Sequence, residues 1–176
     1  MFMRPTATVA EAVSETVPIT MNYVGNTAAI MTMGIKARVE GFLIQRAFVE
    51  GDDVNTGELM YVIDPKPFEA ALEKAQAQLM NNEAAFTYAT AQVERYKGLV
   101  AKDYITQENF DNLVTQMEQA EAAVMGARAD VMTAELNLGY CRMYSPFDGR
   151  VGRTLVDVGN LVGAAGQDTK LATIVQ

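Results

Sequence analysis

Apolar residues recur at alternating steps of four and three along two long stretches of the chain, which is the spacing of coiled-coil helices. Only the six residues "AKDYIT", 101–106, separate the two stretches. Because short connections join antiparallel neighbours, the pattern predicts a helical hairpin over residues 65–142. The stripe positions are Phe68, Leu72, Ala75, Leu79, Asn82, Phe86, Ala89, Val93, Tyr96 and Val100, then Phe110, Leu113, Met117, Ala120, Val124, Ala127, Val131, Ala134, Leu138 and Cys141.

Within each stripe a row of bulky residues alternates with a row of mostly small ones, which lets two helices approach closely and interdigitate. Asn82 interrupts the small row of the first stripe, so we interpret it as a register device or as a contact with a neighbouring chain. Cys141 ends the small row of the second stripe, which indicates a small buried hydrophobic residue rather than a redox group. Thr106 is a good N-cap for the second helix. Each arm would be about 34 residues, or ~50 Å, long.

A short pattern occurs on both sides of the predicted hairpin, as "VEGFLIQRAFVEGDDV" at 39–54 and "FDGRVGRTLVDVGNLV" at 147–162. In both copies an acid precedes a glycine, a second glycine follows ten residues later, and a valine comes three residues after that. Each copy is too short to bury a core alone. We therefore predict one β domain, formed by residues 35–64 and 143–176. The paired glycines are interpreted as turn positions that need unusual backbone angles; they are Gly41, Gly51, Gly149 and Gly159.

The first 34 residues form a separate N-terminal segment in this interpretation. Within it, Val17, Ile19, Met21 and Tyr23 alternate with polar or small residues, which predicts a half-buried strand. An unpaired strand edge seeks a partner. We therefore expect residues 1 to about 30 to be partly disordered or to pair with another chain.

The composition excludes several classes of function. The 176-residue chain has a net charge of −8, which argues against a nucleic-acid partner. It has no histidine and a single cysteine, so histidine-based catalysis and cysteine-rich metal sites are excluded. We find no phosphate-binding or dinucleotide-binding glycine motif. An enzyme is therefore not expected, and no apolar run is long enough to span a bilayer.

Two half-motifs with a coiled-coil hairpin between them resemble the periplasmic adaptor, or membrane fusion protein, family of AcrA/HlyD type, which serves RND-type tripartite multidrug efflux pumps. The stretches "ARVEGFLIQRAFVEGDDVNTGELMYVIDPKPFEAAL" and "LNLGYCRMYSPFDGRVGRTLVDVGNLV" carry the resemblance, which covers roughly residues 16 to 176. It implies an α+β fold, in which a lipoyl/biotinyl-like β-sandwich domain is split by a long antiparallel α-helical coiled-coil hairpin. Residues 1–34 would then supply a strand of a β-barrel or membrane-proximal domain, so the chain is expected to be part of a longer adaptor.

The same resemblance implies a function without catalysis or cofactors. The protein would lie in the periplasm, tethered to the inner membrane, and would link an inner-membrane RND transporter to a TolC-like outer-membrane channel. It would also form a ring of identical copies, expected to be a hexamer.

The family's channel-contacting signature at the hairpin tip is Arg, three residues, Leu, six residues, Ser. The matching residues here are Arg95, Leu99 and Thr106, with threonine in place of serine. Arg95 and Leu99 share a helix face one turn apart. The residues alone favour a solvated charge at Arg95 and only a helix cap at Thr106. The resemblance implies that the three residues contact the outer-membrane channel.

Other functions stay open at this point. An adaptor for an ABC, MFS or metal exporter would have a similar pattern. The close methionine pairs outside the helices, Met1/Met3 and Met31/Met33, are the candidates for a soft-metal site, although spacing alone does not show that their thioethers converge. A carrier domain would place a biotinylated or lipoylated lysine in a tight turn between the half-motifs. Lys66, between two prolines at the predicted helix start, is the nearby candidate, but it does not lie in a protruding turn.

Overall fold

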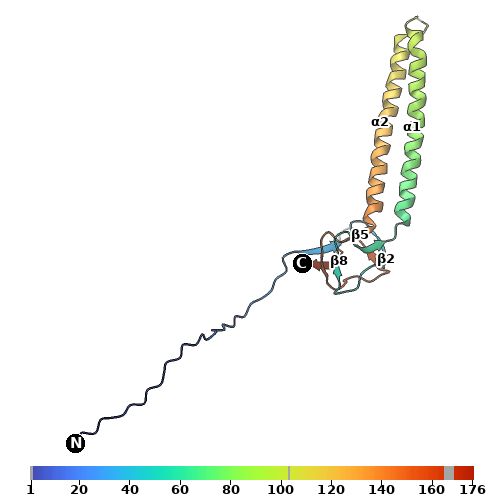
Figure 1. Ribbon diagram of the computed structural model, residues 1–176. Helices are drawn as coiled ribbons and strands as arrows, with labels where there is room; N and C mark the ends of the chain where they lie inside the picture. Colours follow the sequence, from blue (N-terminus) through green and yellow to red (C-terminus); the bar gives the residue numbers. More distant parts are fainter. Residues whose placement is uncertain (1, 103, 165–168) are drawn as a thin grey trace.

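The computed structural model describes residues 2–102, 104–164 and 169–176. Two long helices, α1 (Lys66–Val100) and α2 (Gln107–Tyr140), run antiparallel and project from one side of a small β domain. The N-terminal segment extends away from that domain in a different direction (Figure 1). The predicted hairpin is therefore confirmed.

The contact between the helices follows the predicted stripes. Every stripe position is buried or half-buried, and Val124 and Ala127 are buried most deeply within the hairpin. Two polar contacts set the register: the side-chain amide of Asn82 donates to the carbonyl oxygen of Ala123 at 3.0 Å, and Arg128 pairs with Glu83 at 3.1 Å. Asn82 therefore acts as a register device between the two helices, which is one of its two predicted roles.

Both helices begin where the sequence indicates. Pro65 is the N-cap of α1 and Glu69 lies in its first turn, where a carboxylate interacts favourably with the positive end of the helix dipole. Thr106 is the N-cap of α2, and its hydroxyl accepts a hydrogen bond from the backbone N–H of Asn109 at 3.3 Å.

The β domain consists of two four-stranded sheets in which every pair is antiparallel. One sheet has the order β1-β8-β6-β3 and the other has the order β5-β4-β2-β7. Each sheet takes two strands from each sequence copy, so neither copy completes a sheet alone. The strands are β1 (Thr32–Lys36), β2 (Gly41–Arg46), β3 (Asp53–Val54), β4 (Leu59–Ile63), β5 (Arg142–Tyr144), β6 (Gly149–Val151), β7 (Leu161–Val162) and β8 (Lys170–Val175).

The two sheets are related by the sequence repeat. When each strand is replaced by its equivalent in the other copy (β1 by β5, β2 by β6, β3 by β7 and β4 by β8, or the reverse), one sheet order becomes the other. The domain therefore has an internal pseudo-twofold arrangement. The hairpin leaves after β4 and returns before β5, so it joins the end of one copy to the start of the other.

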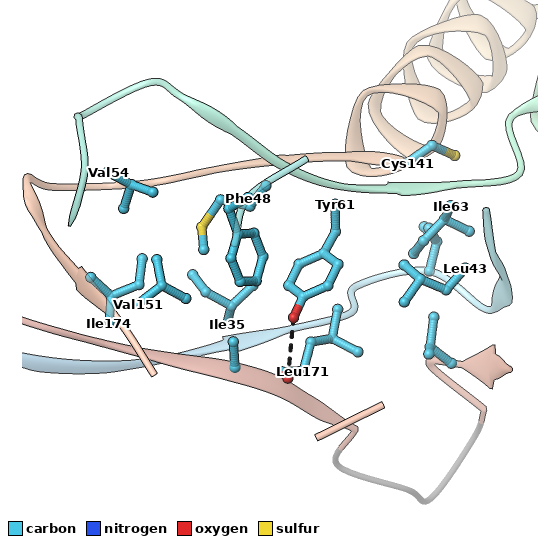
Figure 2. Close-up of a cluster of buried hydrophobic side chains, with 14 residues drawn as sticks. Ile35, Leu43, Phe48, Val54, Tyr61, Ile63, Cys141, Val151, Leu171 and Ile174 are labelled. Atoms are coloured by element: carbon cyan, nitrogen blue, oxygen red, sulfur yellow. Dashed lines mark hydrogen bonds between the residues drawn. The ribbon is translucent and has the colours of Figure 1, made fainter. Parts of the chain in front are cut away.

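The core lies between the sheets and is almost entirely apolar (Figure 2). Tyr61 is fully buried at its centre, with its ring edge-on to Phe48. The Tyr61 hydroxyl contacts the Thr154 hydroxyl and donates to the carbonyl oxygen of Leu171 at 3.3 Å, so its polar end is satisfied. Burial raises the pKa of this hydroxyl, which therefore stays protonated. Cys141 is also fully buried in this cluster, as its place in the stripe predicted.

The interpretation of the four paired glycines is half right. Gly51 and Gly159 have φ values of 88° and 98°, in the region that disfavours residues with a side chain. Gly41 and Gly149 instead begin strands β2 and β6 and do not have positive φ, so the prediction of unusual backbone angles is wrong for them. They are glycines because space is lacking: a Cβ atom on Gly149 would lie 2.6 Å from the carbonyl oxygen of Val175.

The strand predicted around Val17–Tyr23 does not form in this chain. Residues 2–29 have no helix or strand, and the apolar side chains of the alternating stretch are exposed. The alternation produces a strand only where a partner strand supplies hydrogen bonds, and no described strand pairs with this stretch. None of the helices in the described part of the chain has the length and hydropathy of a membrane span.

Candidate functional site at the hairpin tip

The tip of the hairpin is a tight connection from Val100 to Gln107. The carbonyl oxygen of Leu99 accepts two backbone N–H groups there, from Lys102 at 3.2 Å and from Tyr104 at 3.0 Å. This single carbonyl therefore closes the last turn of α1. The Thr106 side chain then caps the first turn of α2, so both ends of the connection are held by local hydrogen bonds.

Arg95 is exposed on α1, Leu99 is half-buried one turn further on, and Thr106 is exposed at the start of α2. The structure thus places Arg95 and Leu99 on neighbouring turns of one helix face, and places Leu99 and Thr106 on either side of the tip connection. Thr106 does have the capping role that was its alternative interpretation, because its hydroxyl binds the helix N-terminus. Thr106 stays exposed although its hydroxyl caps the helix.

The sequence interpretation missed Tyr104. Its side chain is 73% exposed at the end of the hairpin. Ile105 beside it is half-buried. An exposed tyrosine is well suited to a protein contact, because it offers a large rigid apolar surface with a hydroxyl at its edge. The signal was available in the sequence, since the short connection "AKDYIT" contains one aromatic residue.

The chemistry at the tip is that of non-covalent contact. A guanidinium, two apolar side chains, a phenol and a hydroxyl can bind another protein surface, with Arg95 able to donate several hydrogen bonds to carboxylate or carbonyl oxygens. Among the described residues, no group of three or more cysteine, aspartate or glutamate side chains is arranged to hold a metal ion.

The other residues with reactive groups lie far from this tip. Lys66 is the first residue of α1, and its backbone N–H donates to the carboxylate of Asp64 at 3.2 Å, so it belongs to a helix start rather than a protruding turn. The Cys141 thiol is buried at the base of the hairpin, and burial raises its pKa, with Asp64 and Glu69 adding to the effect. A thiol that stays protonated is a poor nucleophile.

Of the two methionine pairs, Met31/Met33 lies wholly within the described residues. Met31 and Met33 are both partly exposed at the start of β1, and Met3 lies in the extended N-terminal segment. Met1 lies outside the described residues. The two pairs belong to different parts of the chain, and a soft metal needs several thioethers that converge.

A two-sheet sandwich that is interrupted between its sequence copies by a long antiparallel hairpin is the fold of periplasmic adaptor proteins. A family model described as "RND MFP, barrel-sandwich hybrid domain" matches residues 31–175 of this chain. The chain therefore belongs to the membrane fusion protein family of RND systems.

Curated relatives and solved structures agree with this assignment. The chain is 39% identical over 152 residues to the multidrug export protein AcrE of Escherichia coli K12, which covers 86% of this chain and 39% of that protein. It is 36% identical over 172 residues to the multidrug efflux pump subunit AcrA of the same organism, with coverage of 98% and 43%. To the multidrug resistance protein MdtA of Pantoea ananatis it is 35% identical over 167 residues, covering 95% of this chain and 40% of that protein.

Among solved structures, a MacA–MexA chimeric protein with the Pseudomonas aeruginosa MexA α-hairpin domain superposes with a TM-score of 0.61 at 30% identity. The match covers 84% of this chain and 47% of that one. MacA from Actinobacillus actinomycetemcomitans gives a TM-score of 0.61 at 26% identity, with coverage of 84% and 50%. The chain spans less than half the length of the curated relatives described above.

Proposed function

We propose that this chain is part of a non-enzymatic periplasmic adaptor that links an inner-membrane RND transporter to a TolC-like outer-membrane channel in multidrug export. The observation that supports this most strongly is the hairpin of two nearly equal arms, 35 and 34 residues, on a β domain that only the two sequence copies together can complete. Family membership and relatives named for multidrug efflux point in the same direction. The protein would be tethered to the inner membrane.

The mechanism is geometric in this proposal, because no bond is made or broken. The β domain fixes the direction of the hairpin, the two helices span about 50 Å at 1.5 Å per residue, and the tip provides a small contact surface. A ring of copies, which we take to be a hexamer, would repeat that contact. Weak single contacts then add up, because each one holds its neighbours at high effective concentration.

Within the tip we assign the channel contact to Arg95, Leu99 and Thr106, and we add Tyr104. Arg95 supplies the charge and the hydrogen-bond donors, while Leu99 and Tyr104 supply apolar area. The capping bond of Thr106 fixes the direction of the first turn of α2 and so the direction of the contact surface. The four residues lie at the far end of the hairpin from the β domain (Figure 1).

Drug susceptibility tests the proposal directly. A strain that lacks the gene for the whole protein is complemented with the intact gene, and minimum inhibitory concentrations are measured for a panel of unrelated drugs and for metal salts. We expect the intact gene to restore resistance to several drugs, and only in the presence of the transporter. Restoration of metal tolerance alone would replace multidrug export with metal export, and no restoration of either would overturn the adaptor assignment.

A carrier function is tested separately by the intact mass of the purified chain. The adaptor proposal expects the mass of the unmodified polypeptide. A biotinyl or lipoyl increment that maps to Lys66 would contradict it.

A further inference from the structure

A cleft of about 590 Å³ lies where the hairpin joins the β domain. Its walls lie within residues 33–38, which include most of β1, and within residues 140–146, which include the end of α2 and all of β5. β1 and β5 are equivalent strands of the sequence repeat, and each is the outermost strand of its sheet. The cleft therefore lies between two sheet edges. Its volume is within the range of sites for small organic ligands, which is about 300 to 1,000 Å³.

The charged residues that line this cleft are all cationic. They are Lys36, Arg38 and Arg142, and among the described residues no aspartate or glutamate lines it. The whole chain has 22 acidic and 14 basic residues, so a cleft with cations alone departs from the general charge of the protein. Lys36 already interacts with another group of the chain. Arg38 and Arg142 are therefore the cations that can receive a ligand.

Neither arginine has an ion pair within the described part of the chain. The guanidinium of Arg38 lies over the ring of Tyr140, 5.2 Å from the ring centroid, and this contact holds it beside the cleft. A guanidinium that stacks on a ring keeps the N–H groups at its edge, and these can form paired hydrogen bonds with the oxygens of an anion. Two arginines without carboxylate partners in an acidic chain indicate an anionic ligand.

Most of the other residues around the cleft are apolar. Ile35 belongs to the buried core, and Tyr140 and Met143 are half-buried against that core. Met33 and Tyr144 also line the cleft and are 43% and 50% exposed. A ligand with an apolar body would remove this surface from water, whereas a small hydrated ion would not.

A neighbouring hollow has a different charge. It shares Arg142 and Tyr144 with the cleft, but Glu69 and Glu135 also line it. An anion that enters this hollow meets two carboxylates and is repelled by them. Electrostatics therefore favours an anion on the side of Arg142 that faces Arg38.

We propose that the cleft is a binding site for an amphipathic organic anion, with one carboxylate or sulfonate group on a body of about two fused rings. Arg38 and Arg142 bind the anionic group. Met33, Ile35 and Met143 contact the apolar body. The site lies at the base of the hairpin, at the opposite end from the tip, so it goes beyond the proposed adaptor function and does not depend on it.

A matched pair of fluorescent dyes tests the requirement for charge. Anilinonaphthalene sulfonate and phenylnaphthylamine share one aromatic skeleton, and only the first has a sulfonate group. Each dye is titrated into the purified chain, and stoichiometry and affinity are measured from the fluorescence. We expect one sulfonate dye to bind per chain, at least about tenfold more tightly than the neutral dye. Equal affinities would show that exposed apolar residues bind both dyes, and would overturn the proposal.

Substitutions of single arginines locate the site. Arg38→Gln and Arg142→Gln should each weaken binding of the sulfonate dye about tenfold, because each removes one cation from the cleft. Arg150→Gln is the matched control, since Arg150 is also an exposed arginine of the β domain but pairs with Asp53 and does not line the cleft. It should leave binding unchanged. The same effect from all three substitutions, or no effect from any, would place the dye elsewhere and overturn the proposal.

Two methionines allow the same charge to be placed inside and outside the cleft. Met33→Glu adds a carboxylate to the lining, whereas Met31→Glu adds one two residues away, at a side chain of similar exposure that does not line the cleft. A ligand that binds only the folded chain raises its melting temperature. Saturating sulfonate dye should therefore raise the melting temperature of the intact chain and of Met31→Glu, but not of Met33→Glu. An equal rise in all three proteins would contradict the location of the site.

Displacement of the bound dye tests whether the site also takes carboxylates. Naphthoate and naphthylmethylammonium have the same ring body and opposite charges. We expect naphthoate to displace the sulfonate dye and naphthylmethylammonium to leave it bound. Equal displacement by both would assign binding to apolar contact alone and contradict the role of the two arginines. Because none of these measurements depends on drug resistance, a failure of the adaptor function would leave their outcome unchanged.

Discussion

Gly51 and Gly159 hold equivalent turns, and each one bonds to the opposite sequence copy. The N–H of Gly51 donates to the carbonyl oxygen of Val151 at 2.9 Å, and the N–H of Gly159 donates to that of Leu43 at 2.7 Å. Leu43 and Val151 are themselves equivalent positions of the repeat. The turns of one copy are thus completed by strands of the other, so the hairpin must return before the domain can close.

The two kinds of paired glycine should respond differently to alanine. Gly51→Ala places a side chain at a positive φ, which costs about 1–2 kcal/mol. Gly149→Ala adds a Cβ atom 2.6 Å from the Val175 carbonyl oxygen, and that backbone cannot move aside without breaking β8. We expect the loss of unfolding free energy in urea to be larger for Gly149→Ala, by about 1 kcal/mol or more.

Gly126→Ala is the control for these substitutions, because it adds the same methyl group in open space on a helix. It should stabilise the isolated chain by up to about 1 kcal/mol. Equal destabilisation by Gly149→Ala and Gly51→Ala would contradict the prediction, because crowding at β6 would then cost no more than a positive φ.

Acid should weaken the contact that Asp148 makes between the two sequence copies of the β domain. Its carboxylate accepts the backbone N–H of Thr56 at 2.6 Å and the Thr56 hydroxyl at 2.8 Å, and these bonds lower its pKa below the ordinary value of 3.8. Because folding lowers the pKa of Asp148, its ionised carboxylate stabilises the fold at pH values above 3.8, the ordinary pKa. This stabilisation is lost as the pH falls through the lowered pKa of the folded state. We expect Asp148→Asn to lower the melting temperature at pH 7, with the difference shrinking as the pH falls below 3.8 and disappearing once the pH is below the lowered pKa of Asp148.

Thr56→Ala provides the matched variant for that measurement. It removes the hydroxyl bond and keeps the backbone N–H, so its melting temperature at neutral pH should lie between those of the intact chain and Asp148→Asn. A difference between the intact chain and Asp148→Asn that persists unchanged through the acid range would assign the effect to packing rather than to the charge.

The helices could be predicted from the sequence because their information is local and repeated. Ten positions at steps of four and three fix one face of each helix, and the structure buries or half-buries all of them. Thr106 could be predicted as a cap because its side chain reaches only its own first turn. The pairing of Glu83 with Arg128 depends on the axial register between α1 and α2, and no local sequence pattern determines that register.

The glycines and the N-terminal segment show where such reasoning fails. A glycine in a sequence indicates that a side chain is not tolerated, but not whether φ or space is the reason. Gly51 and Gly149 have the same pattern and different causes. The alternation at residues 17–23 indicates a surface that can be half-buried, but the partner strand that would bury it must come from elsewhere.

The burial of Val124 makes the hairpin sensitive to charge at this position. Val124 is 6% exposed between the two helices, so Val124→Asp buries a carboxylate without a partner. We expect a loss of several kcal/mol and of much of the helical signal in circular dichroism. Met125→Asp is the control. The Met125 side chain is next in sequence and exposed, so this substitution should leave helicity unchanged. Helicity and melting temperature that survive Val124→Asp would contradict the register of the hairpin.

The tip substitutions separate docking from folding. Arg95 is exposed and Thr106 caps α2, so Arg95→Asp should leave the melting temperature unchanged, whereas Thr106→Ala should lower the stability of the hairpin by about 1 kcal/mol. Arg95→Asp should nevertheless reduce cross-linking between the tip and the outer-membrane channel by about tenfold or more, because it places a carboxylate where donors are needed. The measurement is photo-cross-linking from a reactive group placed at Lys102, with drug resistance followed in parallel.

Two controls make this test specific to the tip. Lys97→Asp reverses a charge on the same helix, but two residues from Arg95 and therefore on a different face, so it should leave channel cross-linking largely intact. Thr106→Ser keeps the capping hydroxyl and removes the methyl group, so stability should be retained while any packing of that methyl against the channel is lost. If Arg95→Asp and Lys97→Asp reduce cross-linking equally, general electrostatics rather than a specific contact governs docking. If neither reduces it, the channel binds elsewhere on the hairpin, and Arg95 is a solvated surface charge.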